Sequence, residues 1–163
     1  MQTAGAQPLH TQRLQARGLR VTRPRLTVLA ILDDATARHE HLAVTQVTER
    51  ARSMLGTLSK QAAYDCLEAL AGAGLVRRIE PAGHPARYEA QVGDNHHHLV
   101  CRGCGATTDA DCAVDTAPCL LPSATHGYVV DEAEVIFWGM CAPCAAAAGP
   151  ARSELPANHV PAS

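Results

Sequence analysis

The sequence has no long apolar run and no recognisable secretion signal. Its 163 residues are 47% hydrophobic, but no segment approaches the roughly eighteen consecutive apolar residues that a membrane span requires. The first eight residues lack the basic segment followed by an apolar one that marks a secreted chain. We therefore expect a cytoplasmic globular protein of one or two small domains, without a membrane partner.

Sequence motifs of common enzyme classes are also missing. There is no H-E-x-x-H zinc-protease motif, no phosphate-binding P-loop, no G-x-S-x-G nucleophile turn and no dinucleotide-binding fingerprint. These absences predict a binding protein, not an enzyme.

Cysteine, by contrast, is abundant. The chain has seven cysteines, an odd number, and disulfides are rare in the cytosol. Four of them form two C-x-x-C pairs, Cys101 with Cys104 and Cys141 with Cys144, and four thiolates complete a closed tetrahedral shell for a structural Zn²⁺. The alternative is a zinc-ribbon redox protein with reactive dithiols. That alternative is disfavoured because neither pair lies in a βαβ context.

The net charge of −2 conceals two halves of opposite sign. Residues 1–91 carry 12 Lys and Arg against 8 Asp and Glu, a balance of +4, whereas residues 92–163 carry 2 against 8, a balance of −6. Arginines near the start have no acidic residue between them, which suits contacts with DNA phosphates, although a solvated surface would look the same. They are Arg13, Arg17, Arg20, Arg23 and Arg25.

The first half predicts three helices followed by a β-hairpin. Thr22 and Ser59 are candidate N-caps for the first and third helices, and apolar residues recur at helical spacing after each. This order is that of a winged helix, whose third helix enters the major groove of DNA, although that helix could also be an ordinary amphipathic surface helix. The predicted helices run from 22 to 34, from 44 to 54 and from 59 to 72, and the predicted strands cover 75–79 and 87–91.

The second half predicts a separate domain rich in short strands, so the fold class is α+β. We place a winged-helix DNA-binding domain at 1–91, a hinge at 92–95, a second domain at 96–148 and a disordered tail rich in Pro, Ala and Ser at 149–163. Residues 112–121 are either a short helix or an irregular crossover. The predicted strands cover 97–100, 106–110, 128–131 and 135–138.

Three consecutive histidines precede the first C-x-x-C pair. In a strand, His96 and His98 share one face and the middle histidine points the other way. Glu89 and Asp109, on neighbouring predicted strands, could each add a carboxylate oxygen, and His41 could come from the helical half. Such a nitrogen and oxygen shell suits Fe²⁺, Mn²⁺, Co²⁺, Ni²⁺ or Zn²⁺. A surface histidine run is the alternative.

Several motifs together resemble those of the ferric uptake regulator (Fur) family over nearly the whole chain. They are R-V-T-R-P-R at 20–25, S-K-Q-A-A-Y-D at 59–65, A-G-L-V-R at 73–77, R-Y-E at 87–89 and H-H-H-L-V-C-R-G-C-G at 96–105. Within the family the chain is most similar to the FurA-type repressors of high-GC bacteria, through A-R-Y-E, V-G-D-N-H-H-H, D-C-A-V, A-P-C-L and D-E-A-E-V-I-F-W-G. The 13 arginines against 1 lysine agree with a high-GC genome.

This resemblance implies a homodimeric repressor that binds a palindromic operator in double-stranded DNA. Each subunit would have a winged helix, a C-terminal α/β dimerisation domain, one structural zinc and a regulatory metal at the hinge. The implied regulatory ligands are His41, Glu89, His96, His98 and Asp109. The ion would favour the domain angle that suits the operator, and loss of the ion would release repression.

The resemblance also implies which residues contact DNA. In the third helix, the residues expected to face DNA are Ser59, Lys60, Gln61 and Tyr64, and Cys66 would lie in the core. The arginines expected to contact phosphates are Arg20, Arg23 and Arg25. Arg17 would enter the minor groove.

Some positions depart from the family pattern. The residues after His41 are apolar where relatives have hydroxyl and acidic residues, which makes His39 a substitute ligand. A further metal site of many relatives would use His97, but Ala133 stands where its later histidine is expected. Cys112 and Cys119, which match only FurA-type relatives, are either redox-active thiols or buried, idle cysteines.

Fe²⁺ is the predicted regulatory metal, with Mn²⁺ next. Zinc-sensing relatives place a cysteine among the hinge ligands, and none occurs between Cys66 and Cys101. Peroxide-sensing relatives have Asp where this chain has Glu89, which favours either iron sensing or a lower peroxide sensitivity. FurA-type repressors are associated with catalase-peroxidase control, so iron-homeostasis and oxidative-stress genes are both expected targets. Sensing of peroxide, Mn, Ni or Zn remains the alternative within the family.

Overall fold

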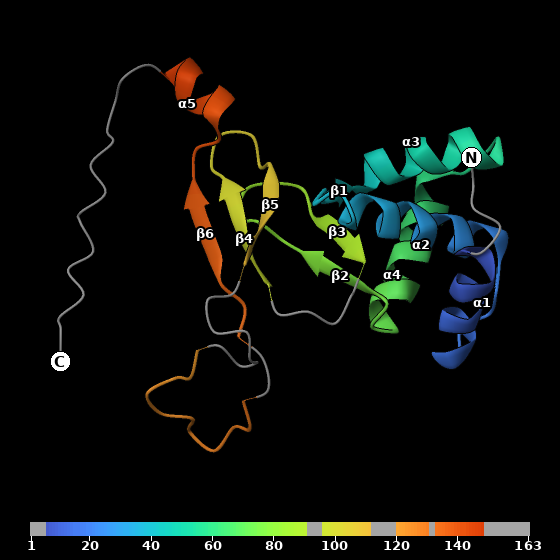
Figure 1. The fold of residues 1–163 in the computed structure, drawn as a ribbon, viewed down its shortest axis with the longest axis horizontal. Coiled ribbons are helices and arrows are strands. Elements are labelled where there is room, and N and C mark those ends of the chain that lie inside the picture. Colours follow the sequence, from blue (N-terminus) through green and yellow to red (C-terminus); the bar gives the residue numbers. More distant parts are fainter. Residues whose placement is uncertain (1–5, 91–95, 112–119, 131–132, 149–163) are drawn as a thin grey trace.

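The structure is a computed structural model that describes residues 6–90, 96–111, 120–130 and 133–148. Figure 1 shows α1 to α4 and a small sheet on one side of the molecule, and a second sheet with α5 on the other. None of the helices in the described ranges is long and apolar enough to cross a membrane. The elements are α1 (Ala6–Ala16), α2 (Arg23–Thr36), β1 (Leu42–Ala43), α3 (Val44–Leu55), α4 (Lys60–Gly72), β2 (Val76–Ile79), β3 (Arg87–Ala90), β4 (His96–Cys101), β5 (Thr107–Asp111), β6 (Ile136–Gly139) and α5 (Ala142–Ala148).

The predicted helices and hairpin of the first half are confirmed. The Thr22 hydroxyl accepts a hydrogen bond from the Arg25 backbone N–H at 3.4 Å, and the Ser59 hydroxyl accepts one from the Ala62 N–H at 3.0 Å, so both caps begin the expected helices. Strands β2 and β3 pair antiparallel, and the two-residue β1 adds to the other edge of β3.

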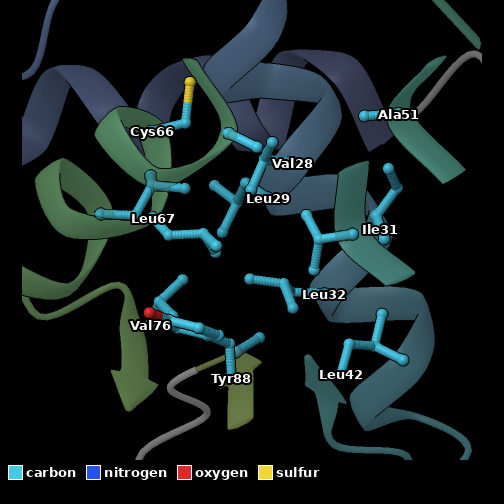
Figure 2. Close-up of a cluster of buried hydrophobic side chains, with 14 of the residues drawn as sticks. Val28, Leu29, Ile31, Leu32, Leu42, Ala51, Cys66, Leu67, Val76 and Tyr88 are labelled. Atoms are coloured by element: carbon cyan, nitrogen blue, oxygen red, sulfur yellow. The ribbon is translucent and has the colours of Figure 1, made fainter. Parts of the chain in front are cut away.

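One apolar core joins α2, α3 and α4 to this three-stranded sheet (Figure 2). The side chains of Leu29, Leu32 and Leu67 are fully buried in it. Cys66 belongs to the same cluster with 8% of its surface exposed, as the sequence predicts. Burying leucine side chains of this size contributes about 1.5–3 kcal/mol each, so this core stabilises the surface on which α4 is presented.

Helix α1 was not predicted from the sequence. It packs on α2 through the fully buried Leu14 and through two side chains that contact Asp33. The Oδ2 atom of Asp33 lies 2.7 Å from His10 Nε2 and 2.6 Å from Arg13 NH1. His10 and Arg13 are 23 and 20 residues from Asp33 along the chain, so local periodicity could not predict these contacts.

The second sheet has the order β5-β4-β6, with β5 antiparallel and β6 parallel to β4. The prediction of a strand at 128–131 is wrong for its described residues, 128–130, which form no strand. Tyr128 and Val129 are 78% and 94% exposed, and no strand of the described ranges pairs with this segment, although its residue types suit a strand. Helix α5, which was not predicted, follows β6.

Some predictions fall outside the described residues. These are the hinge at 92–95, most of the segment at 112–121 with Cys112 and Cys119, and the tail at 149–163.

Candidate metal centres

Five candidate ligands come together where the two sheets approach each other. One nitrogen or oxygen atom from each lies within 4.8 Å of all the others. His41 and Glu89 belong to the helical half, whereas His96, His98 and Asp109 belong to the second sheet. The cluster therefore spans the connection at 91–95, and all five are residues that the sequence predicted as regulatory ligands.

Strand pairing explains how these side chains meet. His41 directly precedes β1, which pairs with β3 so that Leu42 lies opposite Tyr88, next to Glu89. On the other side of the cluster, His98 of β4 lies opposite Asp109 of β5, and the two-residue period of a strand places His96 on the same face as His98.

The imidazoles surround the two carboxylates at short distances. His41 Nε2 lies 2.7 Å from Glu89 Oε2 and 3.0 Å from Asp109 Oδ1. His96 Nε2 lies 3.2 Å from Glu89 Oε2, and His98 Nε2 lies 3.6 Å from Glu89 Oε1. Three imidazole nitrogen donors and two carboxylates form a set that suits a divalent first-row transition metal.

Burial and charge prepare this cluster for a cation. Burial of Glu89 acts to raise the pKa of its carboxyl group, but the neighbouring His41 and His98 outweigh burial and hold that pKa below its ordinary value. Among the described residues, both ring nitrogens of His41 and of His98, and Asp109 Oδ1, are buried without an aligned hydrogen bond. Buried polar atoms of this kind require a partner, and a bound divalent ion would satisfy one nitrogen of each imidazole together with the Asp109 oxygen.

Sequence reasoning missed one neighbour of the site. Arg77 Nε lies 3.8 Å from Glu89 Oε1, because Arg77 faces Glu89 across the β2 and β3 pair. The hairpin register would have indicated this contact. The guanidinium adds positive charge beside a carboxylate that also faces the three imidazoles.

The four cysteines of the C-x-x-C pairs form a second cluster. Their Sγ atoms all lie within 4.8 Å of one another, and Cys104 Sγ lies 3.7 Å from Cys141 Sγ. A zinc tetrahedron with Zn–S bonds of about 2.3 Å has edges of about 3.8 Å. Cys101 ends β4, Cys104 lies in the following turn, and Cys141 and Cys144 lie at the start of α5. The arrangement fits a structural zinc site.

The local environment shifts the pKa values of these thiols in opposite directions. The backbone N–H of Cys141 donates to Cys101 Sγ at 3.3 Å and, with other backbone N–H groups, lowers the pKa of Cys101 to about 6. Hydrogen bonding with the three neighbouring sulfur atoms raises the pKa of Cys144 to about 12. Zinc binds thiolates, so loading this cluster releases protons.

The two additional histidines that the sequence singled out lie outside both clusters. His39 is exposed, and its Nδ1 lies 2.8 Å from Asp109 Oδ2, at the edge of the five-ligand cluster. His97 is buried on the opposite face of β4, with its ring centroid 6.3 Å from that of Phe137.

The predicted DNA contacts lie on and beside α4. Lys60 and Gln61 are exposed in its first turn, and Lys60 Nζ lies 5.9 Å from the centre of the half-buried Tyr64 ring. Ser59 is exposed at the cap of the helix. Arg17 lies near Gly74, beyond the other end of α4. Of the remaining candidates, Arg20 and Arg23 are exposed, and the half-buried Arg25 donates to the Arg20 carbonyl at 2.9 Å.

Known proteins are similar to this chain in sequence and in fold. The family described as "Ferric uptake regulator family" matches residues 16–118. The chain is 50% identical over 137 residues to "Transcriptional regulator FurA" of Mycobacterium tuberculosis, covering 84% of this chain and 90% of the relative. It is 52% identical over 128 residues to "Ferric uptake regulation protein 1" of Mycolicibacterium fortuitum, covering 78% of this chain and 77% of that protein.

A solved structure shows the same fold at low sequence identity. The Vibrio cholerae ferric uptake regulator superposes with a TM-score of 0.62 at 22% identity, covering 80% of this chain and 98% of that one. Its likeness supports the arrangement of an N-terminal helical region and a C-terminal sheet domain. The family match over 16–118 and the 50% identity to FurA show that this chain belongs to the ferric uptake regulator family and is a transcriptional regulator of the FurA type, not an enzyme.

Proposed function

We propose that this protein is an Fe²⁺-dependent, DNA-binding repressor of iron-homeostasis and oxidative-stress genes, including catalase-peroxidase genes. The observation that carries the proposal is the origin of the five clustered ligands. Two come from the helical half and three from the second sheet, so an ion held by all five joins the half that reads DNA to the rest of the chain.

The ligand residues convert metal binding into a change of shape. The imidazoles of His41, His96 and His98 and the carboxylates of Glu89 and Asp109 would hold the ion, which supplies the positive charge that keeps both carboxylates together. An ion favours the closed arrangement only by as much as it binds that arrangement more tightly than the open one. Ligands drawn from both halves provide that difference, because the open arrangement separates them.

The cysteine cluster has a different role in this proposal. Cys101 and Cys104 would hold one Zn²⁺ together with Cys141 and Cys144, leaving no coordination position open to water. Such an ion ties the β4 turn to α5 and stabilises the second domain independently of the hinge.

DNA recognition is assigned to α4 and the nearby arginines. Ser59, Lys60, Gln61 and Tyr64 would contact the major groove. The flanking arginines would contact phosphates and the minor groove; they are Arg17, Arg20, Arg23 and Arg25. A palindromic operator would be read by two copies of the helix in a homodimer.

Exposed apolar side chains on the second half support the homodimer. Leu99, Phe137 and Met140 are 45%, 47% and 47% exposed, and Tyr128 and Val129 are more exposed still. Apolar surface of this kind on a small domain is typical of an interface, and a second copy of the chain would cover it.

Fe²⁺ is the ion that we assign to this ligand set, with Mn²⁺ as its stable substitute in experiments. No thiolate belongs to the five-ligand cluster, whereas nitrogen and carboxylate ligands suit Fe²⁺ and Mn²⁺. Peroxide sensing at the same site is the alternative function. Exposure of the Fe²⁺-loaded protein to peroxide, followed by mass spectrometry, would detect it as oxygen added to a clustered histidine.

The direct test is metal-dependent DNA binding. We expect the purified dimer to bind DNA from upstream of its own gene in the presence of Fe²⁺ or Mn²⁺, and to release it when a chelator removes that ion. The double variant His96→Ala/His98→Ala should lose this dependence but keep one zinc per chain. Failure of the wild-type protein to bind at moderate salt with either ion would overturn the proposal.

Two control variants separate the metal centres. His126→Gly removes an exposed imidazole at a residue with φ +48°, a backbone angle that glycine adopts easily, and should leave DNA binding unchanged. Cys101→Ser should lower the zinc content and destabilise the second domain itself. Loss of zinc from the His96→Ala/His98→Ala variant would show that the two sites are assigned the wrong way round.

A further inference from the structure

His39 forms a contact between the two halves of the protein outside the five-ligand cluster. It lies after the end of α2, where its backbone N–H donates to the Thr36 carbonyl at 2.9 Å. Its backbone φ is +56°, which is uncommon for a residue with a side chain. This conformation directs the imidazole towards β5 of the second sheet, where Nδ1 lies 2.8 Å from Asp109 Oδ2.

The two oxygens of Asp109 therefore have separate partners. Oδ1 lies 3.0 Å from His41 Nε2 and 3.7 Å from His96 Nε2, within the cluster. Oδ2 lies 2.8 Å from Nδ1 of His39. A hydrogen bond to one oxygen restricts rotation of the carboxylate and so fixes the direction of the other.

Exposure distinguishes His39 from the clustered residues. Its side chain is 73% exposed, whereas those of His41 and Asp109 are 1% and 17% exposed. His39 also lines an open cleft of about 430 Å³ together with Arg13, Asp33, His96 and Asp109. Its imidazole is therefore reached by water and contributes little to the core, so its effect on the site can be separated from an effect on folding.

We propose that His39 is a positioning residue for the hinge metal: it donates its Nδ1–H to Asp109 Oδ2, aims Oδ1 at the ion and does not bind the ion itself. This inference rests on the proposed function of the five-ligand cluster. Partners of this kind typically change metal affinity by about 10–100-fold. Because His39 is exposed, we expect an effect of about tenfold, at the lower end of that range.

The positive φ of His39 provides a matched pair of variants. Glycine and asparagine both tolerate this backbone angle, so neither His39→Gly nor His39→Asn strains the turn. Asparagine carries an amide nitrogen at about the position of histidine Nδ1 and retains a donor for Asp109. Glycine retains no donor. An amide is also a much poorer ligand than imidazole for a transition metal, so the pair distinguishes positioning from direct binding.

The experiment measures Mn²⁺ affinity of the zinc-loaded, full-length protein by electron paramagnetic resonance of the free ion. We expect His39→Gly to weaken binding by about tenfold and His39→Asn to restore affinity to near the wild-type value. In an Asp109→Ala background, His39→Gly should have no further effect, because the carboxylate that it positions is gone. Zinc content and melting temperature should stay unchanged throughout.

Other outcomes would overturn the inference. Unchanged affinity in His39→Gly would show that the hydrogen bond has no role in metal binding. Equal weakening in His39→Gly and His39→Asn, or a further loss in the Asp109→Ala background, would show that His39 binds the ion directly. If wild-type protein bound no Mn²⁺, or if His96→Ala/His98→Ala bound it normally, the proposed hinge site itself would be wrong.

Discussion

Cys66 shows how burial decides the chemistry of a single thiol. It lies in the same chain as four clustered cysteines but is packed among apolar side chains of α2 and α4, 8% exposed. Burial raises the pKa of its thiol, with the charges of Arg25 and Asp65 as smaller influences of opposite sign. Cysteine reacts as the thiolate, so this residue is protected twice, by poor access and by protonation.

We predict that Cys66 resists alkylation in the folded protein. Treatment of the zinc-loaded protein with iodoacetamide at neutral pH should leave Cys66 unmodified while the same residue reacts in protein unfolded by urea. Peptide mass spectrometry measures both. Equal rates of modification in the folded and unfolded chains would contradict the burial of Cys66.

The histidines illustrate how far residue-level prediction extended. Alternation along a strand correctly placed His96 and His98 on one face and His97 on the other. His41 and His39 are two residues apart, and the sequence treated them as substitutes for each other. The structure gives them different places. His41 directly precedes β1 and lies within the cluster, whereas His39 lies in the turn after α2 and outside the cluster.

At the scale of elements, the start of α4 depends on the cap formed by Ser59. Its hydroxyl accepts the N–H of Ala62, one of the N–H groups that a helix leaves unpaired at its first turn. The same residue is a candidate DNA contact. Loss of DNA binding in Ser59→Ala would therefore have two explanations.

We predict that Ser59→Ala lowers the free energy of unfolding by about 1 kcal/mol, whereas Ser59→Asn retains the cap and most of the stability. Urea unfolding of the three proteins measures this difference. Ser53→Ala is the matched control, because Ser53 is exposed within α3, where its hydroxyl donates to the Arg50 carbonyl and caps no helix. A similar loss in the control would refute the capping argument.

A second element contact joins the β2–β3 turn to the cysteine cluster. In this turn, His84 Nε2 lies 3.3 Å from the carbonyl oxygen of Arg102, a residue between Cys101 and Cys104 in the sequence. Gly105 follows with φ +67°, and a Cβ atom added there would lie 2.6 Å from the His84 ring. Glycine is required here both by backbone angle and by space.

Gly105→Ala should therefore displace the β2–β3 turn and destabilise the protein. Strain at a positive φ costs about 1–3 kcal/mol, and the clash with His84 adds to it. Gly127→Ala is the control, because Gly127 has φ +85° but nothing within 4 Å of an added Cβ. Thermal unfolding should show a larger loss for Gly105→Ala, and hydrogen exchange should increase at 80–86 only in that variant. Equal effects of the two substitutions would rule out the close contact.

At the scale of the whole molecule, the uneven distribution of charge along the chain affects how the protein interacts with DNA. The half that contains α4 has a balance of +4, and the half that contains the cysteine cluster has a balance of −6. A net charge of −2 therefore does not oppose DNA binding, since residues 1–91, which include α4, carry a positive balance of their own. The acidic half would be repelled by phosphates and kept away from them.

We predict that particular arginines determine how strongly salt weakens the affinity for DNA. Binding of the metal-loaded protein to its operator should weaken as salt rises, and Arg20→Gln and Arg23→Gln should each reduce the slope of log affinity against log salt by about 1. Arg102→Gln, which removes an arginine lying 5.2 Å from the Trp138 ring in the acidic half, should leave the slope unchanged. Fluorescence anisotropy over a salt series measures all four proteins, and an equal slope for all of them would exclude the assigned phosphate contacts.

Local patterns in the sequence were sufficient for part of this protein. Capping residues, helical periodicity and strand alternation act over a few residues, and they predicted α2, α3, α4, the β2–β3 hairpin and the faces of β4. The C-x-x-C spacing and the motifs shared with the Fur family predicted both clusters of ligands, because each cluster uses residue types whose chemistry is evident without coordinates.

Tertiary structure alone decided the contacts between distant segments. It showed that α1 contacts Asp33 and that residues 128–130 form no strand. It also showed that Arg77 lies beside Glu89, and that His39 contacts Asp109, which is 70 residues away along the chain. None of these follows from local periodicity, because each depends on which strands pair and which helices pack together. The residues that can bind a metal are thus recognisable from the sequence. The distances between them exist only in the folded chain, and these distances decide which residues bind the metal and which orient its ligands.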